Sequence, residues 1–119
     1  MRILFVAVSL YASAALAQRG DLSRVQVRIV PVSGQVSTLE GAGGHIGISA
    51  GPDGILIIDD QFAPLAPKID EALRSLKAGP STLRFVLNTH WHGDHTGGNE
   101  YFGRKAPIIA HQNVRLRLA

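Results

Sequence analysis

The sequence contains no cysteine, and this absence limits both how the fold is stabilised and how a metal could be bound. Without cysteine there is no disulfide framework, and any metal site must use histidine, carboxylate and water in place of thiolate. Stability therefore has to come from an apolar core or from a bound metal. The 119 residues, 45% hydrophobic and 18% charged, are an ordinary globular balance and predict one domain or part of one.

Basic charge interleaved with aromatic residues is also lacking. The formal net charge is only +3, and the local basic clusters are Arg104 with Lys105 and Arg115 with Arg117. A groove for nucleic acid would alternate such residues with aromatic side chains, which neither cluster does. We therefore interpret both clusters as solvated surface and predict no nucleic-acid partner.

The N-terminus has the pattern of a secretory signal peptide. In MRILFVAVSLYASAALA, a basic Arg2 precedes an apolar stretch, and Ala15, Leu16 and Ala17 form a small-x-small ending. The alternative is a membrane anchor, but the run from Ile3 to Ala17 is shorter than the roughly 20 residues needed to cross a bilayer. We predict that residues 1–17 are removed, that the protein is periplasmic or secreted, and that it has no membrane association after cleavage.

The rest of the chain, residues 18–119, reads as a succession of short strands and helices. Alternation of Val25, Val27 and Ile29 with polar residues predicts a strand, and QVSTLEG, HIGISA and ILIIDD predict three more, with a Pro-Asp-Gly turn before the last. A helical stripe then runs between Pro64 and Gly79, and it leads to the buried strand LRFVL. A short helix near 99–102, the strand APIIA and a helix from Gln112 follow. This order predicts an α/β fold built on sheets.

The stretch FVLNTHWHGDHTGGN holds the strongest functional signal. Three of the five histidines fall between positions 90 and 95, directly behind an apolar strand and ahead of two glycines. His90 and His92 are two residues apart, so they would diverge by about 200° on a helix but share a side in an extended backbone. Gly93 permits a tight bend, after which Asp94 and His95 can face a second position beside the first. We predict a metal site of imidazoles and carboxylate, which favours zinc and allows iron or manganese.

THWHGDH resembles the His-x-His-x-Asp-His signature of the metallo-β-lactamase superfamily of hydrolases, and LIIDD and HTGGN resemble that family's usual context. The resemblance implies a four-layer αββα sandwich with two metals, expected to be zinc, at the edge of its sheets. It also implies that His90 and His92 bind the first metal and that Asp94 and His95 bind the second. A hydroxide held by the metals would then attack a carbonyl or phosphoryl centre, with Asp94 orienting the water.

Asp59 ends the apolar strand ILIID, where the family carries an aspartate that braces the histidine loop by hydrogen bonds. The alternative for Asp59 is an ordinary capped strand end. We interpret Asp60 as a turn residue and expect Trp91, between two proposed ligands, to pack inward as an anchor. His45 is interpreted as a polar turn residue, although it could line the mouth of the site, and His111 is interpreted as structural.

The resemblance also exposes a deficit, because the family completes its metal sites with ligands downstream of this motif. Beyond Glu100 the chain has His111 and no acidic residue. The match therefore covers the N-terminal half of a family domain, and residues 18–119 are expected to be a partial domain, a fragment of an exported metallohydrolase. A sheet built to face a second sheet would expose an apolar face, so we expect the missing C-terminal half, or an oligomer, to cover it.

Three functional hypotheses remain open at this point. The first is a metal-dependent, two-zinc hydrolase that acts on a small-molecule ester, thioester, lactone, lactam or phosphoester. The second is a non-catalytic zinc-binding or assembly module. The third is a truncated product without function. The substrate, the identity of the metal and the oligomeric state are not determined by the sequence.

Overall fold

The computed structural model describes residues 20–76 and 82–119. The predicted signal peptide lies outside these residues, and so does the end of the helical stretch predicted up to Gly79. Both remain predictions. Within the described ranges, no helix is long and apolar enough to span a bilayer.

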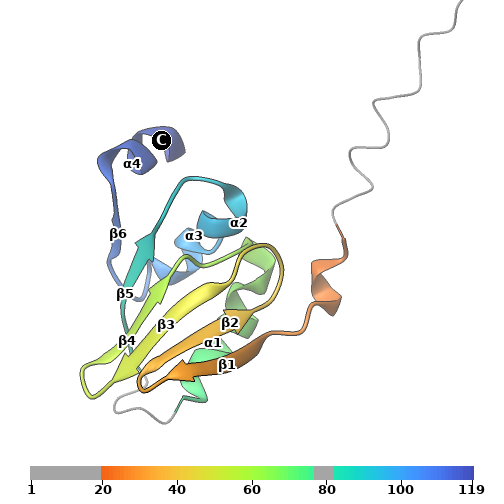
Figure 1. Ribbon diagram of the computed structural model, residues 1–119. Coiled ribbons are helices and arrows are strands. Elements are labelled where there is room, and N and C mark those ends of the chain that lie inside the picture. Colours follow the sequence, from red (N-terminus) through yellow and green to blue (C-terminus); the bar gives the residue numbers. More distant parts are fainter. Residues whose placement is uncertain (1–19, 77–81) are drawn as a thin grey trace, which may run out of the picture.

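Six strands form one sheet in sequence order, β1 to β6 (Figure 1). The first four pair antiparallel in a meander, whereas β4 with β5 and β5 with β6 pair parallel. Their bounds are Arg28–Ser33 for β1, Val36–Glu40 for β2, Ile46–Gly51 for β3, Gly54–Ile58 for β4, Leu83–Asn88 for β5 and Ile108–Ala110 for β6.

The change from antiparallel to parallel pairing has a cause in the connections. The turn between β3 and β4 is short, with Gly54 at a φ of 108°, and it closes a hairpin. A parallel neighbour needs a longer crossover, which the helical segment after β4 provides. As a result, β4 and β5 end at the same edge of the sheet, and the residues that follow them become neighbours.

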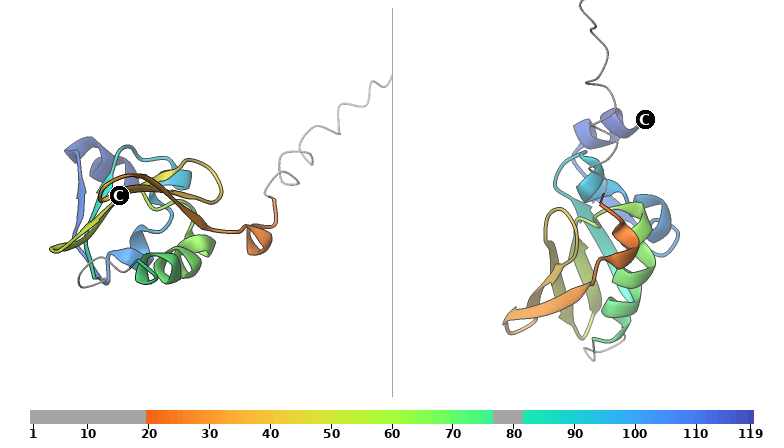
Figure 2. Two further views of the ribbon diagram at one scale, coloured as in Figure 1. Left: turned by 60° about the horizontal axis from the view of Figure 1, so that its bottom comes forward. Right: turned by 90° about the vertical axis from the view of Figure 1, so that its right-hand side faces the viewer.

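The helix α1 lies along one face of the sheet, whereas α4 stands beyond the end of the strands (Figure 2). The crossover contains the 3-10 helix η2 (Ala63–Leu65) and α1 (Ala66–Arg74), and the C-terminal third adds α2 (Gly93–Thr96), α3 (Asn99–Phe102) and α4 (Gln112–Leu118). Apolar side chains of the strands meet those of the helices in a core whose fully buried members include Leu39, Ile46, Ile57, Leu65, Ile69, Val86 and Phe102. A single apolar layer between sheet and helices therefore holds the described part of the chain together.

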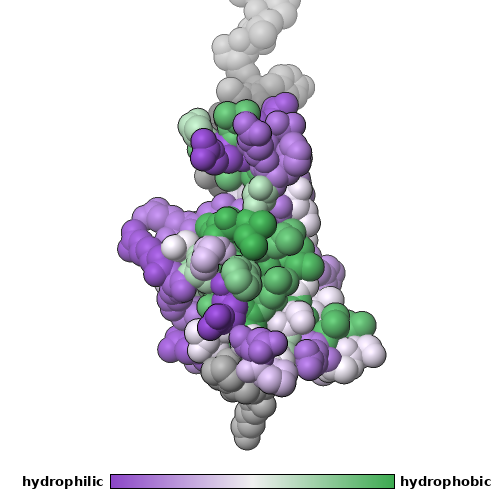
Figure 3. All heavy atoms as spheres, turned by 90° about the vertical axis from the view of Figure 1, so that its left-hand side faces the viewer, coloured by the Kyte–Doolittle hydropathy of each residue, from purple (hydrophilic) through white to green (hydrophobic). Residues whose placement is uncertain are grey.

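The other face of the sheet carries a patch of apolar side chains (Figure 3). Ile58, Phe85 and Ile109 come from three neighbouring strands and are 39%, 39% and 47% exposed. Large adjoining apolar side chains at such exposure are typical of an interaction surface. The sequence predicted that this face of the sheet would need a covering layer.

The element predictions are largely confirmed, with differences at the ends. The predicted first strand began at Val25, but β1 begins at Arg28, and Leu22–Arg24 form a separate 3-10 helix, η1. Val25 and Val27 are half-buried against the core without joining the sheet. Alternation alone could not distinguish a strand that is hydrogen-bonded in the sheet from an extended segment that packs beside the sheet. The predicted helix divides into η2 and α1, with Ser75 capping the end of α1.

Candidate metal centre

The candidate site lies where β4 and β5 end. Backbone pairing continues past the strands, because the Asp59 amide donates to the Leu87 carbonyl over 2.8 Å. This contact brings the end of ILIID against the start of the histidine loop. Ligand sites of α/β sheets commonly lie at the carboxyl ends of parallel strands, as here.

Asp59 is the centre of the arrangement. Its side chain accepts three hydrogen bonds of 2.8 Å, from the Thr89 amide, the Thr89 hydroxyl and Nδ1 of His95. The residue is 5% exposed and adopts a φ of 66°, in the left-handed region of the backbone that few residues other than glycine, asparagine and aspartate adopt. Three hydrogen bonds at a strained, buried position distinguish Asp59 from an ordinary strand cap.

These hydrogen bonds orient two imidazoles. His95 donates through Nδ1 to Asp59, which leaves Nε2 as the nitrogen with a free lone pair. The Thr89 hydroxyl donates to Asp59, so Nδ1 of His90, 2.9 Å away, is the donor in that contact, and Nε2 of His90 is free as well. Fixing the tautomer through the other ring nitrogen is how proteins prepare histidine for a metal.

The loop gathers the four residues that the sequence singled out as ligands. The ring centroid of His90 lies 4.8 Å from that of His92 and 3.9 Å from that of His95. An oxygen of Asp94 lies 3.3 Å from Nε2 of His95, the nitrogen that Asp59 leaves free. His90 and His92 precede α2, in non-helical backbone, and Asp94 and His95 lie on α2 itself.

One grouping differs from the predicted ligand sets. Asp59, His90 and His95 each offer an atom within 4.8 Å of the others and could together hold a metal ion. The oxygens of Asp59 already accept the three hydrogen bonds described above, and a metal ligand would have to give some of them up. We therefore retain Asp59 as the brace and the imidazoles as the donors.

Asp60 differs from its prediction. It is fully buried and does not lie in a turn, and one of its oxygens accepts from the Gly98 amide over 2.9 Å, while the other has no partner among residues 20–76 and 82–119. Burial raises the pKa of Asp60 to about 7, the Gly98 hydrogen bond opposes that rise, and the charge of Asp59 adds to it. The backbone amide of Asp60 also donates to the His95 carbonyl. Asp60 therefore supports, by hydrogen bonds, the loop that carries the proposed ligands, residues 89–98, called the metal loop below.

Gln61 is the functional candidate that sequence reasoning missed. It is 1% exposed with a φ of 57°, and its side-chain amide donates to the Gly44 carbonyl over 2.6 Å and accepts from the Ala42 amide over 3.3 Å. The backbone carbonyl of Gln61 accepts a hydrogen bond from the Gly98 amide. Gln61 thus joins the glycine loop, residues 41–44, through its side chain to the stretch after α2 through its backbone. The run GAGG after a strand was the available signal, since a loop that glycine-rich needs an external partner.

The glycine loop packs directly on the site, and its composition is explained by this contact. A Cβ on Gly43 would lie 2.9 Å from Cβ of Asp94, and one on Gly44 would lie 2.9 Å from the His95 ring. Gly97 fits by the same rule, because its Cβ would approach the Gln61 carbonyl to 2.6 Å. Gly93, where the sequence suggested a tight bend, does not have a positive φ and begins α2.

The remaining candidates lie around the rim. Trp91 does not pack inward as expected: it is 42% exposed, with its ring 4.7 Å from that of His92 and beneath the Arg117 guanidinium. Because His90 and His92 share one side of the non-helical backbone, the indole of Trp91 lies on the other side, at the surface. His45 is exposed and 3.7 Å from Glu40. His111 caps α4, its Nδ1 accepting from the Asn113 amide, as a structural residue would.

The donor set fits a zinc ion. Zinc is bound by imidazole nitrogen and carboxylate oxygen, and the ligating histidines commonly donate their second N–H to a carboxylate or hydroxyl. His95 makes that contact with Asp59, and His90 makes it with Thr89. Of the three hydrogen bonds that the buried Asp59 carboxylate accepts, one comes from an imidazole and one from the hydroxyl that contacts His90. The identity of the metal is not specified by these residues, because iron and manganese accept the same donors.

Fold and site together define a metal-site protein of the metallo-β-lactamase class, and sequence comparison agrees. The family model of the metallo-beta-lactamase superfamily matches residues 40–114, and the chain belongs to that superfamily. The resemblance stated from THWHGDH is thereby confirmed.

Curated relatives and solved structures are similar to this chain over part of their own length. An atrochrysone carboxyl ACP thioesterase of Emericella nidulans is 35% identical over 80% of this chain and 30% of its own length. A hydroxyacylglutathione hydrolase of Synechococcus is 46% identical over 34% of this chain and 16% of its own. A metallo-beta-lactamase from Cronobacter sakazakii superposes with a TM-score of 0.70 at 23% identity, over 79% of this chain and 38% of that one. The Rm3 metallo-beta-lactamase gives 0.66 at 25%, over 76% and 35%.

The chain spans only part of these proteins, about 30% and 26% of the length of two of the curated thioesterases that it matches. The predicted fold class, an α/β portion of the metallo-β-lactamase sandwich, is confirmed by the structural neighbours. Activity, substrate and partners of the whole protein belong to the proposals that follow.

Proposed function

We propose that this chain supplies the first metal-binding motif of a zinc-dependent, two-metal hydrolase, and that the complete protein cleaves an acyl substrate, a thioester in the first place. The observation that carries this proposal is the Asp59 brace. It leaves Nε2 of His90 and His95 free at one edge of the sheet, beside His92 and the Asp94 carboxylate.

Each residue has a distinct part in the proposal. His90 and His92 hold the first metal, and Asp94 with His95 hold the second, while Asp59 and Thr89 keep the imidazoles in the tautomer that binds. Zinc lowers the pKa of coordinated water towards neutrality, which supplies the nucleophile. The Asp94 carboxylate, 3.3 Å from Nε2 of His95, would also help to orient a water molecule held at that site. Belonging to the superfamily supports these roles, since the four residues fall within the matched region.

The names of the relatives favour thioesters among the possible substrates. One relative is named as a carboxyl ACP thioesterase and another as a hydroxyacylglutathione hydrolase. Esters, lactones, lactams and phosphoesters remain further members of the same hydrolytic class. We propose that the remainder of the protein packs on the patch of Ile58, Phe85 and Ile109. It would also supply the remaining metal ligands, at the ends of β4 and β5.

The decisive experiment uses the full-length protein, loaded with zinc and assayed on a panel of acyl thioesters. We expect His92→Ala to lower kcat/KM at least about 100-fold and to reduce the bound metal, measured by elemental mass spectrometry, because a ligand is removed. Chelation should abolish turnover, and zinc should restore it. His111→Asn is the matched control, since asparagine also caps a helix and His111 lies outside the proposed ligands.

The alternative function, a non-catalytic zinc module, predicts a different outcome. The protein would bind zinc through the same imidazoles, lose it in His92→Ala, and hydrolyse no member of the panel. Turnover that survives both chelation and His92→Ala would contradict the metal-dependent hydrolase.

A further inference from the structure

A groove of about 780 Å³ lies directly beside the metal loop. Its walls come from four parts of the chain: the segment before β1, the glycine loop, the stretch entering η2, and α2 with the glycine after it. The lining residues are Gly20, Asp21, Leu22, Val25, Ala42, Phe62, Ala63, Pro64, Gly93 and Gly97. The volume is that of a pocket for a small molecule.

The outer wall of the groove is a built feature. Lys68 on α1 donates to the carbonyls of Ser23 and Val25, over 2.6 Å and 2.9 Å, and so ties the segment around η1 to the helix. Asp21 caps η1 through the Ser23 amide. Leu22 and Val25 are half-buried against the core. Figure 2 shows η1 beside the segment that holds η2 and outside the six-stranded sheet.

The inner end of the groove reaches the candidate metal centre. Gly93 and Gly97 flank Asp94 and His95 in the sequence, and both line the groove. A Cβ on Gly93 would meet nothing within 4 Å, so the backbone there faces open space. Ala42 adjoins Gly43, which packs on Asp94. A molecule lying in the groove would therefore end next to the residues proposed to act on it.

The lining has one chemical character. Leucine, valine, phenylalanine, proline and alanine side chains supply most of it, and Asp21, near the outer end, is the charged residue among those that line it. Such a surface gains from removing apolar groups from water and offers little to a polar headgroup. Asp21 would repel an anionic occupant, and the apolar side chains offer a sugar little to hydrogen-bond.

We propose that this groove binds the apolar acyl chain of the substrate, with Leu22, Val25 and Phe62 as specificity-determining residues. The inference rests on the proposed hydrolase function and deepens it. The acyl carbon to be attacked lies at the Gly93 end, beside Asp94, and the chain runs outward under the segment held by Lys68. Selectivity for chain length is then set by residues that precede the first strand, far in sequence from the metal motif.

The first test measures kcat/KM of the full-length zinc enzyme on acetyl, hexanoyl and decanoyl thioesters of one thiol. We expect kcat/KM to rise about threefold for each methylene that enters the groove, and the gain to stop when the groove is filled. Ala63→Phe, which fills the groove from an exposed lining position, should lower the decanoyl-to-acetyl ratio about tenfold or more. Val25→Ala should lower it about threefold, with the change carried by KM.

Val32→Ala is the matched control for Val25→Ala, because Val32 is an exposed valine of β1 outside the groove. It should leave the decanoyl-to-acetyl ratio unchanged. A ratio that is flat along the acyl series, or that responds equally to both valine variants, would overturn the proposal while leaving the hydrolase function intact.

The second test needs no turnover and separates the two proposals. Decanoate binding to the metal-free full-length protein is measured by calorimetry, with acetate as the reference. Decanoate should bind with a negative heat-capacity change and should be weakened by Ala63→Phe but not by Val32→Ala. If no thioester is hydrolysed but decanoate still binds in this way, the hydrolase proposal fails and the apolar site stands. No decanoate binding, together with a flat acyl series, removes the site.

Discussion

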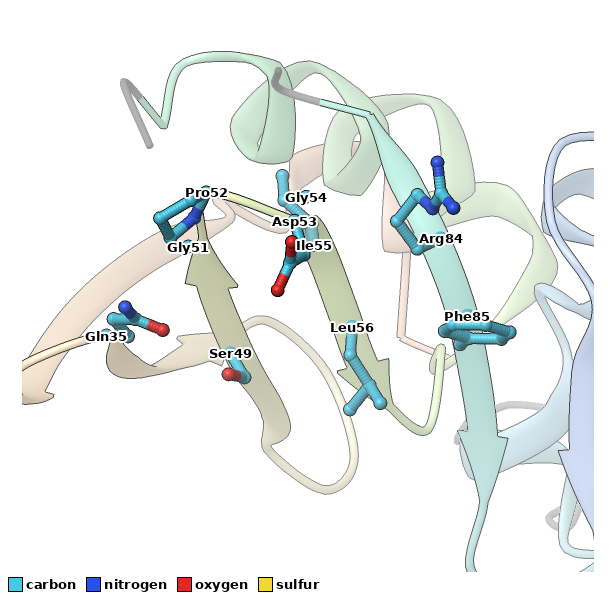
Figure 4. A pocket seen from close by; sticks show the side chains of 10 residues that line it. All are labelled: Gln35, Ser49, Gly51, Pro52, Asp53, Gly54, Ile55, Leu56, Arg84 and Phe85. Atoms are coloured by element: carbon cyan, nitrogen blue, oxygen red, sulfur yellow. The ribbon is translucent and has the colours of Figure 1, made fainter. Parts of the chain in front are cut away.

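The two ends of the parallel strands β4 and β5 are built very differently. At the carboxyl end, Asp59, Asp60 and Gln61 are all buried, and two of them have positive φ. At the opposite end, the turn of Pro52 and Asp53 is exposed, and the hollow beside it, about 240 Å³, is open and lined by residues such as Gln35 and Arg84 (Figure 4). Buried polar residues and strained backbone cost free energy, so their concentration at one end marks where the structure serves a purpose other than folding.

Each end of these strands carries an aspartate, and substituting the two aspartates tests the difference between the ends. Asp59→Asn is expected to weaken zinc binding by the full-length protein about 10- to 100-fold, because it removes the carboxylate that fixes the tautomers of His95 and, through Thr89, of His90. Asp53→Asn, at the exposed turn, should leave the affinity unchanged. A competition titration against a zinc chelator measures both. Equal effects at the two ends would contradict the bracing role of Asp59.

The second prediction compares two glutamines. Gln61→Ala is expected to destabilise the full-length protein by about 2 kcal/mol, because it leaves backbone groups of Ala42 and Gly44 without their partner and opens a cavity. Gln35→Ala, an exposed position at the other end, should change stability by less than about 0.5 kcal/mol. Urea unfolding of the metal-free protein measures the difference. If Gln61→Ala cost no more than Gln35→Ala, the glycine loop would not depend on Gln61.

The same contrast explains how far the sequence could be read. The strands, the crossover and the histidine loop were predictable because each depends on a local pattern: alternation, a helical stripe, or metal donors at close spacing. Asp59 was found through the family resemblance. The contacts of Asp60 and Gln61 were not predictable, because their partners, Gly98 and the glycine loop, lie at distant places in the sequence. Nothing in IDDQF shows that the last two polar residues point inward.

Trp91 and Val25 show a different kind of error: a local rule overstated the burial of Trp91, and alternation placed the half-buried Val25 in a strand that it does not join. An indole between two histidines was expected to anchor the loop, but Trp91 is 42% exposed, and its neighbour His92 is exposed as well. Val25 and Val27 continue the alternation of β1 without its hydrogen bonds, since Lys68 holds that segment to α1 instead. Apolar side chains at these places therefore line or flank the site, which composition could not separate from core packing.

A further prediction concerns the pH dependence of stability at the two ends of the strands. The pKa of Asp60 is raised to about 7 in the folded protein from an ordinary value near 3.8. Between these values the folded state holds a proton that the unfolded chain has lost, so this group makes the protein less stable as pH rises from about 4 to 7. Asp60→Asn removes the titration, and its stability relative to the unaltered protein should increase by at least about 1 kcal/mol between pH 4 and 8. Asp53→Asn should show no such trend. Urea unfolding of the metal-free protein at several pH values gives the comparison, and parallel profiles for the Asp60 variant and the unaltered protein would show that the buried carboxyl is not protonated at neutral pH.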